Sequence, residues 1–277
     1  MRPVSTAQRT YRYLRLALAG APIALLISVA IAAVEVGVLP TVSHFFYTPA
    51  RTVFSGALVA ASACLLALSG RGPQRALLDI AALLAPLIAI VPTPLGRGEV
   101  AGLAVDCATA CIPAPYDADL DNAVAVYLVM AALAVAIGVV LSVRGEVVAR
   151  EVVPTLAVGV GVIAAVGLTW ALARDVFVAS GHTVAAFSFF AVIAAVAIAE
   201  VRRPSSAHPP SPLVRRAYVV LAAAMIVDLG ATSILGGLIE LPIVFVGEVI
   251  ALLLFVAFWL VQTRQKWTER DAAARSM

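Results

Sequence analysis

Long unbroken apolar runs are the feature that most constrains this chain. Stretches such as VMAALAVAIGVV carry no polar residue at helical or strand spacing, whereas the elements of a soluble chain would show a polar face. Of the 277 residues, 62% are hydrophobic and 13% are charged, against about 45–50% and about 25% in a typical soluble domain. The runs and the composition together predict an integral membrane protein.

Eight apolar segments are long enough to cross the hydrocarbon core, which takes about 20 residues of helix. Strands of a membrane barrel would alternate polar and apolar residues at every second position, and these segments do not. We therefore predict an all-α bundle of about eight transmembrane helices in a single domain, residues 1–277. The predicted spans are 14–39, 52–69, 76–94, 123–143, 154–173, 180–199, 217–238 and 242–261.

The basic residues predict the orientation of the bundle, because lysine and arginine are retained on the cytoplasmic side during insertion. With the N-terminus inside, 16 of the 19 basic residues fall in cytoplasmic segments, and only Arg51, Arg97 and Arg174 fall outside. We therefore predict a multi-pass protein of the plasma (inner) membrane of a bacterium, with both termini cytoplasmic. Seven spans would instead place the basic C-terminal tail outside.

Three connecting segments stand out between and after the spans. The external loop 95–122 is rich in glycine, proline and aspartate, and we predict an irregular cap. A proline-rich connector, 200–216, and a short tail, 262–277, are predicted to be cytoplasmic. Cys107 and Cys111 lie four residues apart in the external loop, where an oxidising exterior permits a disulfide.

Aromatic residues lie near the predicted ends of several spans, where membrane proteins concentrate them at the interface with water. The sequence therefore predicts an anchoring belt that includes Phe45, Phe46, Tyr47, Tyr218 and Trp259.

Carboxylates inside the spans are the strongest indication of a site, because a charge in hydrocarbon is expensive and faces a partner or a cavity. Asp228 lies near the middle of span 217–238, with Thr232 one turn further on. At a rise of 1.5 Å per residue, Glu248 on the next span lies within about 6 Å of the same depth. Carboxylates that close would share a proton. The pair predicts a proton-binding or substrate-binding site, and a structural hydrogen bond between helices is the alternative.

A second set of polar residues is predicted at the external ends of the spans. Histidine, arginine and carboxylates on one membrane surface can bind a metal, a phosphate headgroup or a small anion. The alternative is that these residues merely cap helix ends. The set comprises Glu35, His44, Tyr47, Arg51, Asp175 and His182, with His44 and His182 as the candidate metal ligands.

The stretch SHFFYTPARTVFSGALVAASACLLALSGRG, followed by ALLDIAALLAPLIAIVPT and later by GHTVAAFSFF, resembles an uncharacterised group of bacterial polytopic membrane proteins. The resemblance implies a shared architecture and no particular reaction. It draws attention to Ser43, Tyr47, Thr48, Arg51, Phe54, Gly56, His182 and Phe190.

The segment LLDIA around Asp79 is more weakly similar to the CREST-type membrane hydrolases, which use a serine, an aspartate and three histidines around zinc. Here His182 is followed four residues later by Ala186, so the second histidine of their H-x3-H pair is absent. Arg75, four residues before Asp79 on the same helical face, gives Asp79 an ion-pair partner instead.

Function is less constrained than architecture. The chain has no P-loop, G-x-S-x-G elbow, H-E-x-x-H helix or paired CxxC motif, and it lacks the basic face that binds nucleic acid. The first hypothesis is a protein without catalysis that binds a lipid or small molecule between its helices or serves a membrane complex. The second is a proton-coupled transporter that uses Asp228 and Glu248, and the third is a lipid-headgroup enzyme with an external histidine and carboxylate site. No cofactor is predicted, and the predicted partners are membrane lipids and a possible small-molecule ligand.

Overall fold

The computed structural model describes residues 5–69, 73–108, 110–202, 209–236, 238 and 242–267. Over these residues the chain forms eight α-helices and one short 3-10 helix, η1, so the predicted all-α architecture is confirmed. The elements are α1 (Thr6–Val36), η1 (Ser43–Tyr47), α2 (Arg51–Leu68), α3 (Pro73–Ile90), α4 (Ala114–Val143), α5 (Ala149–Leu172), α6 (Arg174–Arg202), α7 (Pro212–Leu235) and α8 (Ile243–Gln265).

Seven of the helices in the described part of the chain are long and apolar enough to cross a membrane. Helix α3 has 18 residues and carries Arg75 and Asp79 in its first two turns. These two side chains form an ion pair across one helical turn, with 3.7 Å between Nε and Oδ2.

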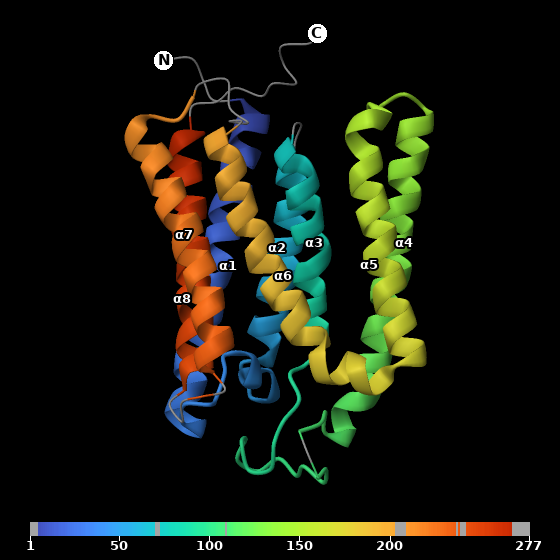
Figure 1. Cartoon of the computed structure of the whole chain (residues 1–277), viewed down its shortest axis with the longest axis vertical. Helices are drawn as coiled ribbons and strands as arrows, with labels where there is room; N and C mark the ends of the chain where they lie inside the picture. Colours follow the sequence, from blue (N-terminus) through green and yellow to red (C-terminus); the bar gives the residue numbers. More distant parts are fainter. Residues whose placement is uncertain are drawn as a thin grey trace.

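The helices form an elongated bundle (Figure 1). The start of α1 and the end of α8 lie at one end, here called the termini end, and η1 lies at the opposite end, here called the η1 end. Helices α1, α7 and α8 form one side of the bundle, and the α4–α5 hairpin forms the other. Between them α6 crosses obliquely and contacts α3, α5, α7 and α8.

Five of the aromatic side chains assigned to an interfacial belt are buried. In η1, between α1 and α2, the ring of Phe46 packs against Phe54 of α2 and Tyr116 of α4. Tyr218 of α7 packs against Phe258 of α8, which also contacts Trp259. The buried rings are those of Phe45, Phe46, Tyr47, Tyr218 and Trp259.

The external loop is shorter than the sequence predicts, because α4 begins at Ala114 instead of near residue 123. Pro113 is extended, with φ −60° and ψ 142°, and Asp117 lies in the first turn; a proline and an acidic residue both favour a helix start. Two hydrogen bonds between the backbones of Leu95 and Cys111 close the segment that precedes α4. Residues 203–208 of the connector and 268–277 of the tail lie outside the described residues.

Candidate functional site

The polar centre of the η1 end is built around the short helix η1. Its residues are all buried, and Phe45 packs its ring against Phe245 of α8 with 6.2 Å between centroids. A helix start leaves backbone N–H groups without intrahelical partners. Here the N–H groups of Val42 and Ser43 both donate to Oε2 of Glu248, which lies in the second turn of α8.

A continuous hydrogen-bonded chain runs from Glu248 across η1 to α6. Ser43 Oγ lies 2.8 Å from Glu248 Oε1 and 2.7 Å from His182 Nε2. His182 Nδ1 lies 2.7 Å from the carbonyl oxygen of Val91, just after α3. His182 and Ser43 are buried. We call Glu248, Ser43 and His182 the relay triad, because one hydroxyl joins the two ionisable side chains.

The geometry allows two arrangements of the protons in the relay triad. Since a carbonyl can only accept, the Nδ1 of His182 carries a proton and donates to Val91. The single hydroxyl hydrogen of Ser43 can go to Glu248 or to His182. In the first case His182 is an imidazolium that donates to Ser43, and Glu248 is a carboxylate. In the second case Glu248 is protonated and donates to Ser43, and His182 is neutral. The fully bonded triad therefore holds one proton that can sit at either end.

Two members of the relay triad, Ser43 and Glu248, line an otherwise apolar pocket, here called the core pocket. This pocket is a small cavity of about 70 Å³. Ser43 and Glu248 supply its ionisable and hydroxyl groups, and the rest of the lining is apolar. The apolar lining comes from α1, α2, α3, α6 and α8 and includes Pro22, Leu25, Phe54, Leu58, Ile88, Phe189, Phe190 and Phe255.

Glu248 also lines a second cavity of about 90 Å³, here called the side pocket, which lies among α6, α7 and α8. His182 and Asp228 line the side pocket as well. Asp228 further lines a cleft between α7 and α8, together with the exposed Val246 and Ile250. The two carboxylates singled out from the sequence therefore share one pocket, and Asp228 lies between that pocket and the surface cleft.

Asp228 has no hydrogen bond or ion pair with another described residue, and this includes Thr232, one turn further along α7. Thr232 instead faces α8 at Gly247. A Cβ added at Gly247 would overlap Thr232 Oγ1 and lie 3.2 Å from Thr232 Cβ. The missing side chain at residue 247 thus permits the close approach of α7 to α8 beside Glu248.

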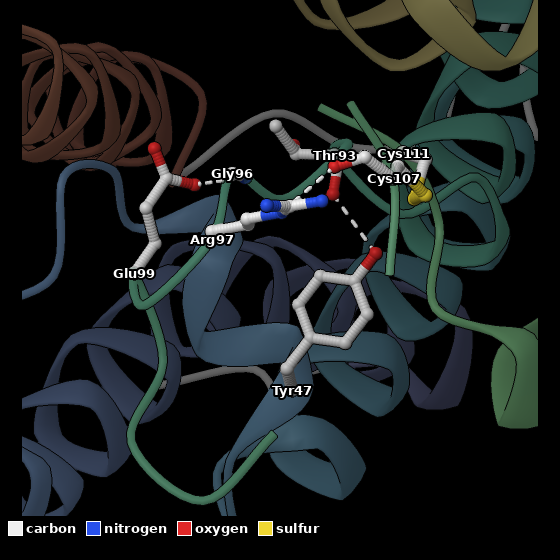
Figure 2. Close-up of a disulfide and its surroundings, with 7 residues drawn as sticks. All are labelled: Tyr47, Thr93, Gly96, Arg97, Glu99, Cys107 and Cys111. Carbon is white, nitrogen blue, oxygen red and sulfur yellow. Dashed lines mark hydrogen bonds between the residues drawn. A yellow bond between two sulfur atoms is a disulfide. The ribbon is translucent and has the colours of Figure 1, made fainter. Parts of the chain in front are cut away.

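His44 lies next to the relay triad but points to the segment before α4. Its Nδ1 contacts Thr41 Oγ1, and its Nε2 lies 3.2 Å from Glu99 Oε2. Glu99 in turn accepts a hydrogen bond of 2.6 Å from the N–H of Gly96 (Figure 2). Burial lowers the pKa of His44 below its usual value, although Glu99 partly opposes this. His44 therefore anchors this segment to η1.

Tyr47 and the disulfide have similar anchoring contacts (Figure 2). Tyr47 donates from its hydroxyl to the carbonyl oxygen of Thr93 at 2.9 Å, and burial raises the pKa of its phenol. Cys107 is bonded to Cys111, and Arg97 Nε donates to the Cys107 carbonyl oxygen at 3.0 Å. These contacts close the segment beneath η1.

The remaining residues of the predicted external set do not join the site. Arg51 pairs with Asp119 of α4 at 2.7 Å, and its guanidinium lies over the Phe46 ring. Glu35 and Asp175 are exposed, and neither makes a hydrogen bond or ion pair with another described residue. Within the described ranges, no three histidine, cysteine, aspartate or glutamate side chains lie close enough together to hold a metal.

Sequence reasoning missed Ser43 as the joining residue, although the resemblance drew attention to it. It also missed a buried polar network at the termini end. There Arg15 donates to Gln262 at 2.5 Å, and Lys266 Nζ lies 2.6 Å from Glu200 Oε1. Gln262 donates to the same Glu200 oxygen at 3.2 Å. These residues lie at the predicted ends of spans, where apolar runs stop and the sequence no longer indicates burial.

No family model, curated protein or solved structure matches the chain.

Proposed function

We propose that this protein binds an amphiphilic small molecule or lipid between its helices, with the apolar part in the core pocket and the polar part at Glu248 and Ser43. The observation that carries the proposal is the presence of a carboxylate, Glu248, and a hydroxyl, Ser43, in the lining of a pocket that is otherwise apolar. A site of this kind orients a ligand through a few polar groups and gains affinity from apolar burial.

The aromatic side chains of the pocket support the same proposal. Phe189 of α6 stacks on Phe255 of α8 with 5.7 Å between ring centroids, and Phe190 lies edge-on to Phe189 at 5.3 Å. Rings held this way supply a rigid apolar wall. We place the ligand's hydrocarbon portion against this wall.

Photolabelling tests the proposal. The probe is octanol with a diazirine on its third carbon, added to the protein in lipid nanodiscs and crosslinked by light. Peptide mapping should locate the label at the core pocket, and Leu58→Trp should reduce labelling several-fold by filling the pocket. Val59→Trp is the matched control, because the neighbouring side chain is 50% exposed and faces away from the pocket. Equal labelling of the two variants would contradict the proposal.

Proton-coupled transport is the second candidate function. The observation that favours it is that Asp228 and Glu248 line the same pocket and that Asp228 also lines the surface cleft. In liposomes containing the protein and an internal pH dye, an inward proton gradient should drive export of a transported amphiphile. Asp228→Asn should slow this flux, whereas the exposed Asp175→Asn should leave it unchanged. Equal flux in the two variants would argue against this candidate.

We further propose that the η1 end faces outward, with both termini in the cytoplasm of a bacterium and the chain in its plasma membrane. The distribution of basic residues supports this orientation, and a disulfide at the η1 end suits an oxidising exterior. A C-terminal fusion to green fluorescent protein should fluoresce, and one to alkaline phosphatase should be inactive. The opposite pair of results would reverse the orientation.

A further inference from the structure

We infer that the ligand of the core pocket carries a positively charged head, and that its binding to Glu248 displaces the proton held by the relay triad. This inference rests on the proposed binding function and specifies the chemical class of the ligand: an alkylammonium or a similar lipophilic cation.

The charged and ionisable groups around the two pockets favour a ligand with a positively charged head. No lysine or arginine is among the described residues that line the core pocket or the side pocket. The ionisable groups that face this space are Glu248 of α8, Asp228 of α7 and His182 of α6. Behind η1, His44 pairs with Glu99, while α1, α2 and α3 contribute apolar side chains to the core pocket. An anionic head would meet two carboxylates, and the one basic side chain among these groups, His182, already uses both ring nitrogens in bonds to Val91 and Ser43.

The hydrogen bonds of Glu248 leave room for such a head. Its Oε2 accepts from two backbone N–H groups, whereas its Oε1 contacts Ser43. A carboxylate oxygen can accept two hydrogen bonds, so Oε1 retains acceptor capacity toward the pocket. The rings of Phe54, Phe189 and Phe190 in the same lining offer faces on which a cation is attracted.

The side pocket is also lined by a residue with a buried polar atom that lacks a hydrogen-bond partner among the described residues. The Oγ1 of Thr93 is buried, has no hydrogen-bond partner among the described residues, and belongs to a residue that lines this pocket beside His182. Such an atom costs free energy unless water or a ligand group satisfies it. We therefore expect water bound at Thr93 Oγ1 in the side pocket, and this water can accept a proton that leaves His182.

Charge balance explains why binding and proton release are coupled. The fully bonded triad is neutral overall in either arrangement, because it holds either an imidazolium with a carboxylate or two neutral groups. When an ammonium head pairs with the Glu248 carboxylate, an imidazolium at His182 would leave one excess positive charge in the bundle. Loss of the Nε2 proton of His182 to water in the side pocket restores neutrality, and Ser43 then donates to His182. No covalent bond is formed, and one cation replaces one proton, so the site avoids an uncompensated buried charge.

The test uses the full chain in lipid nanodiscs at pH 7 in weak buffer with a pH indicator. Octylammonium, which is protonated at this pH, should release close to one proton per bound protein. Its affinity should rise up to about tenfold per pH unit while the triad is protonated, because proton and cation compete. The matched probes 1-octanesulfonate and octanol should release none, and 1-octanesulfonate should bind at least tenfold more weakly than octylammonium.

Variants separate the triad from effects of the lipid. Glu248→Gln should abolish proton release, and Glu248→Asp should retain it. Glu35→Gln removes the same charge from an exposed position at the η1 end and should behave as the unmodified chain. Equal release by Glu248→Gln and the unmodified chain, or equal affinity for octanesulfonate and octylammonium, would overturn the inference. If octanol photolabels the core pocket and octylammonium releases no proton, the binding function survives and the cation inference fails; if neither occurs, both fail.

Discussion

Replacing Ser43 by alanine should destabilise the fold far more than removing another serine hydroxyl. Ser43 contacts the ionisable side chains of His182 and Glu248 at 2.7 and 2.8 Å. Hydrogen bonds to charged groups contribute roughly 1.5–3 kcal/mol each, so in the arrangement with a charged His182 and Glu248 the loss of both should cost about 3 kcal/mol or more. The matched control is Ser62→Ala, which removes a single bond of 2.6 Å to the carbonyl of Ala82. A hydrogen bond between membrane helices is worth about 0.6 kcal/mol on average.

The assay for this prediction is reversible unfolding in mixed micelles, followed by circular dichroism as the denaturing detergent is increased. Ser43→Ala should lower the free energy of unfolding by at least about 2 kcal/mol more than Ser62→Ala does, as the two estimates imply. The difference comes from the bridging position and not from the loss of a hydroxyl as such. Equal destabilisation by the two variants would refute the reasoning that Ser43 joins two buried ionisable groups.

Three other predictions follow from the packing and charge of the bundle. Gly247→Ala should lower the melting temperature, because the added Cβ would overlap Thr232 Oγ1. Adding Thr232→Ala to the same chain should restore part of that loss. An unchanged melting temperature in the single variant would count against the close contact of α7 with α8. Burial lowers the pKa of His44 below the usual 6.5, so its contribution to the free energy of unfolding is present above pH 6.5 and is lost as the pH falls below that value. His44→Gln should therefore flatten the dependence of the free energy of unfolding on pH. A pH dependence identical to that of the unmodified chain would contradict the assignment. Glu200→Gln should destabilise the bundle by about 3–5 kcal/mol, because it removes the carboxylate that lies 2.6 Å from the buried ammonium of Lys266. A loss below about 1 kcal/mol, as for an exposed pair, would show that this pair is solvated.

Apolar runs were sufficient to predict the helices, because a membrane span is a property of local composition and length. The same rule predicted the start of α4 too late, because Asp117, Asp119 and Asp121 belong to its first turns although they are polar. Polar residues can begin a helix when a neighbour satisfies them. Here Arg174 bonds to Asp121 at 2.5 Å and to Asp117 at 3.1 Å, a contact between distant positions that composition does not reveal.

The site was partly accessible to sequence reasoning. Depth along two consecutive spans placed Asp228 and Glu248 near one another, and both line the side pocket. The meeting of His182 with Ser43 depends on how η1 folds beneath α6, and residues 139 positions apart in the chain give no local signal of contact. Glu35 and Asp175 illustrate the converse, because a shared membrane surface did not bring them into the site.

The measurement that tests the central claim most directly is a density map of the protein in lipid nanodiscs with octylammonium present. The account predicts continuous density in the core pocket, running from the ring of Phe255 to a head group within about 3 Å of Glu248 Oε1, the distance of a charge-assisted hydrogen bond. A pocket filled by the chain's own side chains, with Glu248 contacting only η1, would contradict it.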